Sequence, residues 1–205
     1  MANRIALIGA TGRIGSRTMA ELLRRGHAVT AISRHPEKTP AGANITAAEG
    51  DFTQPASLAA VLKGHDAVIS SAPFIPRHSE DLIEAVRQSG VKRFLMVGGA
   101  SSLEVSPGKK LFEAIQLPPE WLEPVKEGMR ALELLRDVTD LDWTYFSPAA
   151  LIEPGSRTGK FRLGGDQLVS DAEGKSRISF EDYAVALVDE LEKPAHIKRR
   201  FTIGY

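Results

Sequence analysis

Short apolar runs alternate along the chain with longer segments in which apolar residues recur at helical spacing. Most runs are apolar at nearly every position, which is typical of strands buried on both faces of a parallel sheet. They predict strands at 4–8, 28–32, 45–48, 67–69, 94–97, 143–146 and 201–203. The intervening segments predict helices at 12–25, 58–62, 79–89, 124–136 and 180–192, with Gly26 and Gly90 closing two of them and Pro124 in the first turn of another.

Strands that alternate with helices at this pace indicate βαβ units and right-handed crossovers. The sequence therefore predicts an α/β fold: a single Rossmann-like domain over residues 1–205, with a doubly wound parallel sheet and helices on both faces. Two irregular stretches, 98–120 and 151–177, follow strand ends. Ligands bind beyond the carboxyl ends of strands in such sheets, so both stretches are predicted to be small substrate-covering loops. The alternative is that they are ordinary surface connections.

A glycine-rich segment, GATGRIG at 9–15, lies between the first predicted strand and the first predicted helix. Glycines in this context let the backbone turn tightly and approach a pyrophosphate at the positive end of the helix. The segment predicts a dinucleotide site, and its cofactor-binding residues are Gly9, Thr11, Gly12, Arg13, Ile14 and Gly15. The alternative is a glycine-rich turn without a ligand.

The end of the second predicted strand indicates which dinucleotide binds. Enzymes that prefer NAD place a carboxylate there for the ribose 2′-hydroxyl, but here Ser33 and Arg34 occur and no acid precedes Glu37. Arg34 can pair with a 2′-phosphate, so NADP(H) is favoured over NAD(H). Further predicted cofactor contacts follow the third and fourth strands: Asp51, Phe52, Ser71, Ala72 and Pro73. Asp51 could instead be a turn or cap residue, and Arg34 and Arg13 could be solvated surface cations.

Composition excludes several other classes of function. The chain has no cysteine, so disulfides, thiolate metal sites and cysteine nucleophiles are absent, and its five histidines are scattered without metal-ligand spacing. Lys and Arg together number 26 and balance 26 Asp and Glu, so neither nucleic acid nor an anionic membrane is an expected partner. No apolar run approaches a membrane span, and the apolar run after Arg4 is too short for a secretory signal. We expect a cytoplasmic monomer or weak homodimer that acts on a small molecule. The basic run 198–200 is expected to be solvated.

Several segments occur together in one order: GATGRIG at 9–15, GDF at 50–52, SSAP at 70–73, FLMVGGASSLEV at 94–105 and WTYFSPAALIEPGSRTGKFRLGGDQLV at 143–169. Through them the whole chain resembles the atypical short-chain dehydrogenase/reductase family. The resemblance is to its NmrA-like, NAD(P)H-binding branch, which includes proteins labelled NADH-flavin reductase and, more distantly, biliverdin reductase B. The resemblance implies bound NADP(H) and hydride transfer to a flavin, with FMN or FAD as the substrate. It also implies that Pro148 and Ala149 run under the nicotinamide, and that Ser101 and Ser102 lie where the family has its catalytic serine.

The acid that conventional relatives use is missing. They exchange a proton through a Tyr-x-x-x-Lys pair, yet the residues four beyond Tyr145 and Tyr183 are alanine and leucine, and Tyr205 ends the sequence. Trp121 stands where that tyrosine is expected, and with Phe74 and His78 it is a candidate substrate contact; each of these could equally be a packing or exposed loop residue. The sequence thus predicts an NADP(H)-dependent reductase of a flavin or similar conjugated acceptor. The alternative is an NmrA-like regulatory protein that senses NADP(H), and an epimerase or dehydratase would need a tyrosine base that is absent.

Overall fold

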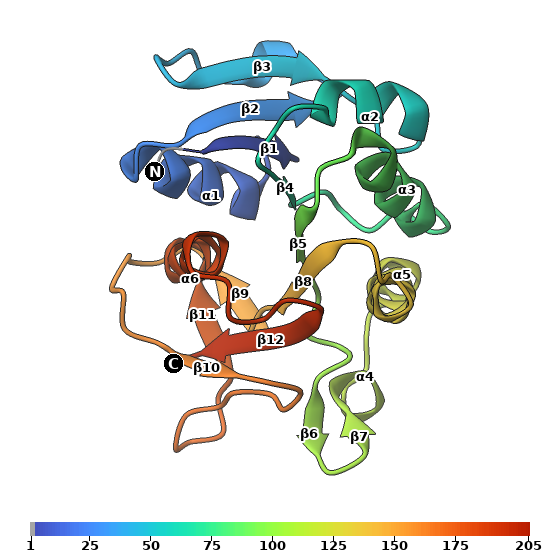
Figure 1. The fold of residues 1–205 in the computed structure, drawn as a ribbon. Helices are drawn as coiled ribbons and strands as arrows, with labels where there is room; N and C mark the ends of the chain where they lie inside the picture. Colours follow the sequence, from blue (N-terminus) through green and yellow to red (C-terminus); the bar gives the residue numbers. More distant parts are fainter. Residues whose placement is uncertain (1–2) are drawn as a thin grey trace.

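The computed structural model describes residues 3–205, and one mixed sheet runs through the molecule (Figure 1). Seven of its strands are parallel, and the eighth, at one edge, is antiparallel to its neighbour. In sequence they are β1 (Arg4–Ile8), β2 (Ala28–Ser33), β3 (Ile45–Glu49), β4 (Ala67–Ser70), β5 (Arg93–Val97), β8 (Asp142–Ser147), β10 (Arg162–Gly164) and β12 (Arg199–Gly204). Their order is β10-β12-β8-β5-β4-β1-β2-β3, so the chain reverses its direction of travel between β1 and β4. This order confirms the predicted Rossmann-like α/β fold; the antiparallel β10 is an addition to the all-parallel prediction.

Helices cover both faces of the sheet (Figure 1). One face carries α1 (Arg13–Arg24) and α6 (Phe180–Glu192), and the other carries α2 (Pro55–Leu62), α3 (Ser79–Ser89) and α5 (Pro119–Arg136). A separate hydrophobic cluster fills the space under each layer. None of the helices in residues 3–205 combines the length and the hydrophobicity that a membrane crossing demands.

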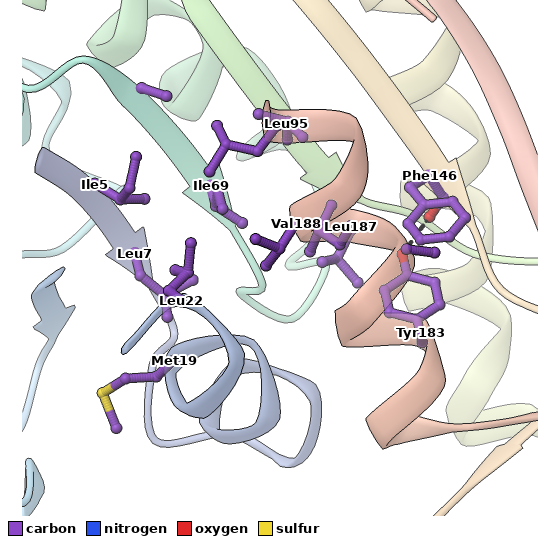
Figure 2. Close-up of a cluster of buried hydrophobic side chains, with 14 of the residues drawn as sticks. Ile5, Leu7, Met19, Leu22, Ile69, Leu95, Phe146, Tyr183, Leu187 and Val188 are labelled. Atoms are coloured by element: carbon purple, nitrogen blue, oxygen red, sulfur yellow. Dashed lines mark hydrogen bonds between the residues drawn. The ribbon is translucent and has the colours of Figure 1, made fainter. Parts of the chain in front are cut away.

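Figure 2 shows the cluster beneath α1 and α6. Leu22 of α1 and Leu187 of α6 are fully buried and pack with sheet residues such as Leu7 and Leu95. Tyr183 stacks on Phe146 with 4.1 Å between ring centroids, and its hydroxyl donates to the Phe146 carbonyl at 2.5 Å. The phenol of Tyr183 is therefore a packing group of the core, as the helical pattern suggested.

The boundary of α5 differs from the sequence prediction. The helix begins at Pro119, which occupies its first turn, whereas Pro124 lies inside it. A proline inside a helix removes one backbone hydrogen bond, the one to the carbonyl four residues earlier. That carbonyl belongs to Glu120, which is exposed, so water can satisfy it. Trp121 consequently belongs to the first turn of α5 and not to a preceding loop.

Several very short elements were not predicted, because two- to four-residue segments carry no readable periodicity. They are the 3₁₀ turn η1 (Pro36–Lys38), the hairpin of β6 (Glu104–Ser106) and β7 (Lys109–Lys110), α4 (Leu111–Ala114), and the pair β9 (Leu151–Glu153) and β11 (Arg177–Ser179). Apart from η1, they give regular structure to parts of the two stretches that the sequence presents as irregular.

Candidate functional site

The glycine segment forms a tight turn between β1 and α1 that tolerates no side chain at its critical positions. Gly9 has φ +78°, and a Cβ added there would lie 2.7 Å from the Ser71 carbonyl oxygen at the end of β4. A Cβ on Gly15 would lie 2.1 Å from the Gly9 carbonyl oxygen, because the first turn of α1 packs directly on the glycine turn. Gly9 and Gly15 are thus required by close backbone approach.

The amino end of α1 is left open beside this turn. Gly12 is the N-cap residue and offers no side-chain hydrogen bond. Within residues 3–205, the backbone N–H groups of Arg13, Ile14 and Gly15 find no acceptor. A helix amino end with unsatisfied N–H groups and a positive partial charge is suited to a pyrophosphate.

A groove of about 230 Å³ leads from the glycine turn along the carboxyl ends of the strands. Its lining contains many of the predicted cofactor residues: Gly9, Thr11, Gly12, Ser33, Arg34, Phe52, Ser71, Ala72 and Pro73. His35 and Lys38 line it as well, although the sequence interpretation passed over them. Lys38 reaches the groove because η1 folds the chain back after β2. The only available sequence clue was a second cation shortly after Arg34.

Asp51 lies beside the groove and is not part of its lining. Its Oδ1 accepts a hydrogen bond from the backbone N–H of Thr53 at 2.9 Å. This bond, assisted by the nearby Arg34 cation, lowers the pKa of the Asp51 carboxyl below its ordinary value. The structure shows that Oδ1 of Asp51 holds the turn, and the predicted contact of Asp51 with the cofactor stays a prediction.

A second, apolar cavity of about 590 Å³ adjoins the groove. Its volume falls in the roughly 300–1,000 Å³ range of small-molecule sites. The walls come from the loop after β4, the loop after β5 and the amino-terminal part of α5: Pro73, Phe74, Ser101, Ser102, Glu120, Trp121, Pro124, Val125 and Met129. The remaining lining residues are Gly98, Gly99, Gly128 and Tyr145. Pro73 lines both the groove and the cavity, so the two spaces meet there.

Tyr145 lines this cavity but is not available as an acid. Its hydroxyl donates to the Gly128 carbonyl at 2.8 Å and accepts from the Gly99 N–H at 3.1 Å. The side chain is fully buried, and burial raises the pKa of its phenol to about 12. A phenol with this pKa and both hydrogen bonds occupied cannot exchange a proton near neutral pH.

The two candidate serines both line the cavity. Ser102 is largely buried, and its Oγ accepts a hydrogen bond from the Arg200 guanidinium at 3.3 Å. Ser101 is more exposed, and no hydrogen bond to its hydroxyl is formed within residues 3–205.

The side chains of five other predicted site residues line neither the groove nor the apolar cavity. His78 precedes α3, and its Nδ1 contacts the Asp81 carboxylate at 2.6 Å. It does not line the apolar cavity, but it lines a small space together with Pro73 and Phe74 of the cavity wall. Arg13 and Ile14 contribute backbone to the end of α1, and their side chains do not line the groove. Pro148 and Ala149 are buried at the end of β8 and line neither space.

Residues 98–120 and 151–177 differ in where they lie. The first stretch supplies five lining residues of the cavity: Gly98, Gly99, Ser101, Ser102 and Glu120. The second supplies none to the groove or the cavity. Instead, Arg157 donates two hydrogen bonds to Glu21 of α1, both at 2.8 Å, and Thr158 and Gly159 donate backbone hydrogen bonds to Asp182 of α6. Residues 157–159 therefore attach this stretch to the layer of α1 and α6, whereas β10 within it joins the edge of the main sheet.

An open helix amino end, a glycine turn and a groove at the point where strand order reverses define a Rossmann-fold nucleotide-binding protein. The residues present fit a dinucleotide, because the glycine turn allows close approach of phosphates and the groove carries cations at its far end. A family model described as NAD(P)H-binding matches residues 9–194. The chain belongs to this NAD(P)H-binding family of atypical short-chain dehydrogenases/reductases.

Similar proteins extend over the full length. YwnB of Bacillus subtilis is 35% identical, and the match covers 98% of this chain and 97% of YwnB. A solved structure from Bacteroides thetaiotaomicron, provisionally named an epimerase, is 44% identical with a TM-score of 0.93 and coverage of 100% and 98% of the two chains. One from Burkholderia pseudomallei, provisionally named an exported protein, is 46% identical with a TM-score of 0.88 and coverage of 99% and 100%.

A third structure, from Streptococcus pneumoniae, carries the provisional name NADH-flavin reductase. It is 36% identical, has a TM-score of 0.85 and covers 99% of each chain. The names of these relatives point to different activities and locations, although the fold is shared. The chemistry of this chain must therefore be argued from its own site.

Proposed function

We propose that this protein is an NADPH-dependent reductase that passes hydride to a planar, conjugated small molecule such as a flavin. The observation that carries the proposal is the junction at Pro73, where the nucleotide groove opens into the apolar cavity. A nicotinamide held at one side of that junction would face an acceptor held at the other. Among the cavity's lining residues the one carboxylate is Glu120 and there is no Lys, Arg or His. Such a lining suits a flat aromatic ring system better than a sugar or a small acid.

Three features of the groove favour NADPH over NADH. Arg34 and Lys38 both line it and could pair with a 2′-phosphate, and the Ser33 hydroxyl could add a hydrogen bond. No Asp or Glu lines the groove at the position where a carboxylate would hold a free 2′-hydroxyl. Charge-assisted hydrogen bonds of this kind contribute about 1.5–3 kcal/mol each.

NADPH would supply the hydride, and the chain's own residues would bind, orient and exclude water. The open amino end of α1 would hold the pyrophosphate. Phe74, Trp121 and Met129 would sandwich the acceptor, because aromatic and thioether side chains pack well on flat rings. A flavin or quinone needs no strong enzymic acid, so the occupied phenol of Tyr145 is compatible with this chemistry.

The test is NADPH and NADH oxidation at 340 nm with riboflavin, FMN and a simple quinone in turn, against enzyme-free controls. We expect saturable turnover with a preference for NADPH. Arg34→Ala should raise KM for NADPH about tenfold or more and leave KM for NADH nearly unchanged. Lys63→Ala, which removes an exposed cation at the end of α2, is the matched control and should change neither.

Two results would overturn the proposal. If every acceptor fails while NADPH binds with micromolar or tighter affinity in calorimetry, the protein is better described as a sensor of NADP(H). If Arg34→Ala weakens NADPH and NADH equally, the assignment of the 2′-phosphate contact is wrong.

A further inference from the structure

Arg200 lies behind the apolar cavity. Its place in the basic run 198–200 predicted a solvated cation, but the structure buries it. Its side chain is 4% exposed, although its partner Asp166 is 65% exposed. In the β8–β12 register Arg200 is opposite Tyr145, so the two side chains share the face of the sheet that the cavity occupies. Arg199, one residue earlier, is exposed.

The guanidinium of Arg200 connects two groups. Its Nε and Nη2 both bond to Oδ1 of Asp166, the Nε bond at 2.7 Å, and its Nη1 donates to Oγ of Ser102 at 3.3 Å. A guanidinium can only donate, so the Ser102 oxygen is the acceptor in that bond. The hydroxyl proton of Ser102 has no acceptor within residues 3–205, and Ser102 lines the cavity.

Ser102 stands where the family resemblance implies a catalytic serine, so a hydrogen bond from its hydroxyl to a carbonyl oxygen of the acceptor is the expected role. We propose that Arg200 is the positioning residue that holds and polarises this hydroxyl. The inference rests on the proposed reductase function and narrows its substrates to conjugated carbonyl compounds, such as quinones and the isoalloxazine ring of flavins. A hydrogen bond from a charged donor draws electron density from the serine oxygen and makes its proton a stronger donor.

The electron balance explains why this arrangement matters. The C4–H bond of the dihydronicotinamide would break, a C–H or N–H bond to the conjugated acceptor would form, and the displaced π electrons would move onto the carbonyl oxygen. The acceptor is reduced by two electrons, the nicotinamide is oxidised by two, and water supplies the proton. Negative charge thus grows on the oxygen that Ser102 contacts, and a preorganised donor backed by a buried cation stabilises it most in the transition state.

A purely structural role for Arg200 would be to hold Asp166, in the turn after β10, against β12. The two roles make different predictions for Asp166→Asn, which removes the ion pair and keeps the Arg200–Ser102 contact. If the role is structural, Arg200→Met and Asp166→Asn lower stability alike and leave kcat unchanged. If Arg200 acts by positioning the Ser102 hydroxyl, Asp166→Asn keeps kcat, whereas Arg200→Met lowers kcat.

The experiment measures kcat and KM for a quinone and for riboflavin in Ser102→Ala, Arg200→Met, Arg200→Lys and the Ser102→Ala/Arg200→Met double variant. We expect each single loss to reduce kcat about tenfold or more, since removing one donor of this kind typically costs about 10²–10³. The double variant should be no worse than the more damaged single variant, and Arg200→Lys should recover part of the rate. Arg199→Met is the matched control and should behave as the unaltered protein. The inference would be overturned if the losses of the two single variants multiply in the double variant. It would also be overturned if Arg200→Met is as active as Arg199→Met.

Equilibrium binding separates a failure of this inference from a failure of the proposed function. Riboflavin fluorescence is titrated with each variant in the absence of NADPH. If the unaltered protein reduces no acceptor, the reductase proposal fails. The Ser102 contact would still stand if Ser102→Ala and Arg200→Met weaken riboflavin binding to the same extent, and it would fall if neither does.

Discussion

Glu21 provides a quantitative test of how the long stretch 151–177 is tied to the Rossmann core. Its carboxylate lies on α1, is 4% exposed, and bonds to Arg157 and to Arg25 at 2.8 Å each. The hydrogen bonds from Arg157 are the largest cause that lowers the pKa of Glu21, from 4.5 to about 2. A carboxylate whose pKa falls by this amount on folding stabilises the folded state by about 3 kcal/mol at neutral pH.

The perturbation is Glu21→Gln, which keeps the size of the side chain and one hydrogen-bonding oxygen but removes the charge. Because the pKa is lowered in the folded state, the stabilisation is complete above the unfolded value of 4.5 and is lost as pH falls toward about 2. We therefore expect the variant to lose about 3 kcal/mol in the free energy of unfolding at pH 7, with the gap shrinking steadily below pH 4.5.

Urea unfolding followed by circular dichroism at pH 7, 5, 4 and 3 gives the two stability curves. Glu133→Gln is the matched control, because Glu133 is an exposed glutamate paired with Arg136 and its removal should change stability little at any pH. A gap between Glu21→Gln and the unaltered protein that is the same at pH 7 and pH 3 would refute the reasoning. So would a gap at pH 7 no larger than that of the control.

Four further predictions concern the site. Gly9→Ala should abolish NADPH binding in calorimetry, because its Cβ would lie 2.7 Å from a backbone oxygen at φ +78°; retained affinity would argue against the tight-turn requirement. Gly128→Val should raise KM for every acceptor at least tenfold without changing NADPH affinity, since its Cβ would lie 3.0 Å from the Phe74 ring and force that wall of the cavity to shift; an unchanged KM would place the acceptor elsewhere. Glu120→Lys should improve kcat/KM for FMN about fivefold relative to riboflavin, because it replaces the cavity's one carboxylate with a cation, while Glu123→Lys on the same helix should not. Burial raises the pKa of Tyr145 to about 12, so kcat for a quinone should vary less than about twofold from pH 6 to 9, and a bell-shaped profile would reveal an acid that we have not identified.

The fold could be predicted because most of its strands are apolar at nearly every position and its helices have clear periodicity. The nucleotide groove was also predictable in large part, since its residues follow strand ends that share one edge of the sheet. Lys38 was not predicted to line the groove, because the 3₁₀ turn η1 places it there and such a short turn has no readable sequence pattern.

The cavity was much harder to predict. Gly98, Gly128 and Tyr145 come from separate elements and meet only after β8 and α5 have packed together. Tyr145 has the sequence pattern of any core residue of a strand. Arg200 was misinterpreted because a run of three cations suggests solvent, and nothing local indicates that Ser102, almost a hundred residues away, lies over it.

Tyr145 also explains why this site can do without the usual acid and still be well formed. A Cβ on Gly98 would lie 2.2 Å from the Tyr145 ring, so the ring occupies the space that a side chain would otherwise take. Its hydroxyl then joins Gly99, after β5, to Gly128 of α5, and this fixes the distance across the cavity. A phenol used in this way holds the walls apart and contributes no proton. In the proposed reductase, water would then protonate the product, and quinones and flavins suit such a site because they accept hydride without an enzymic acid.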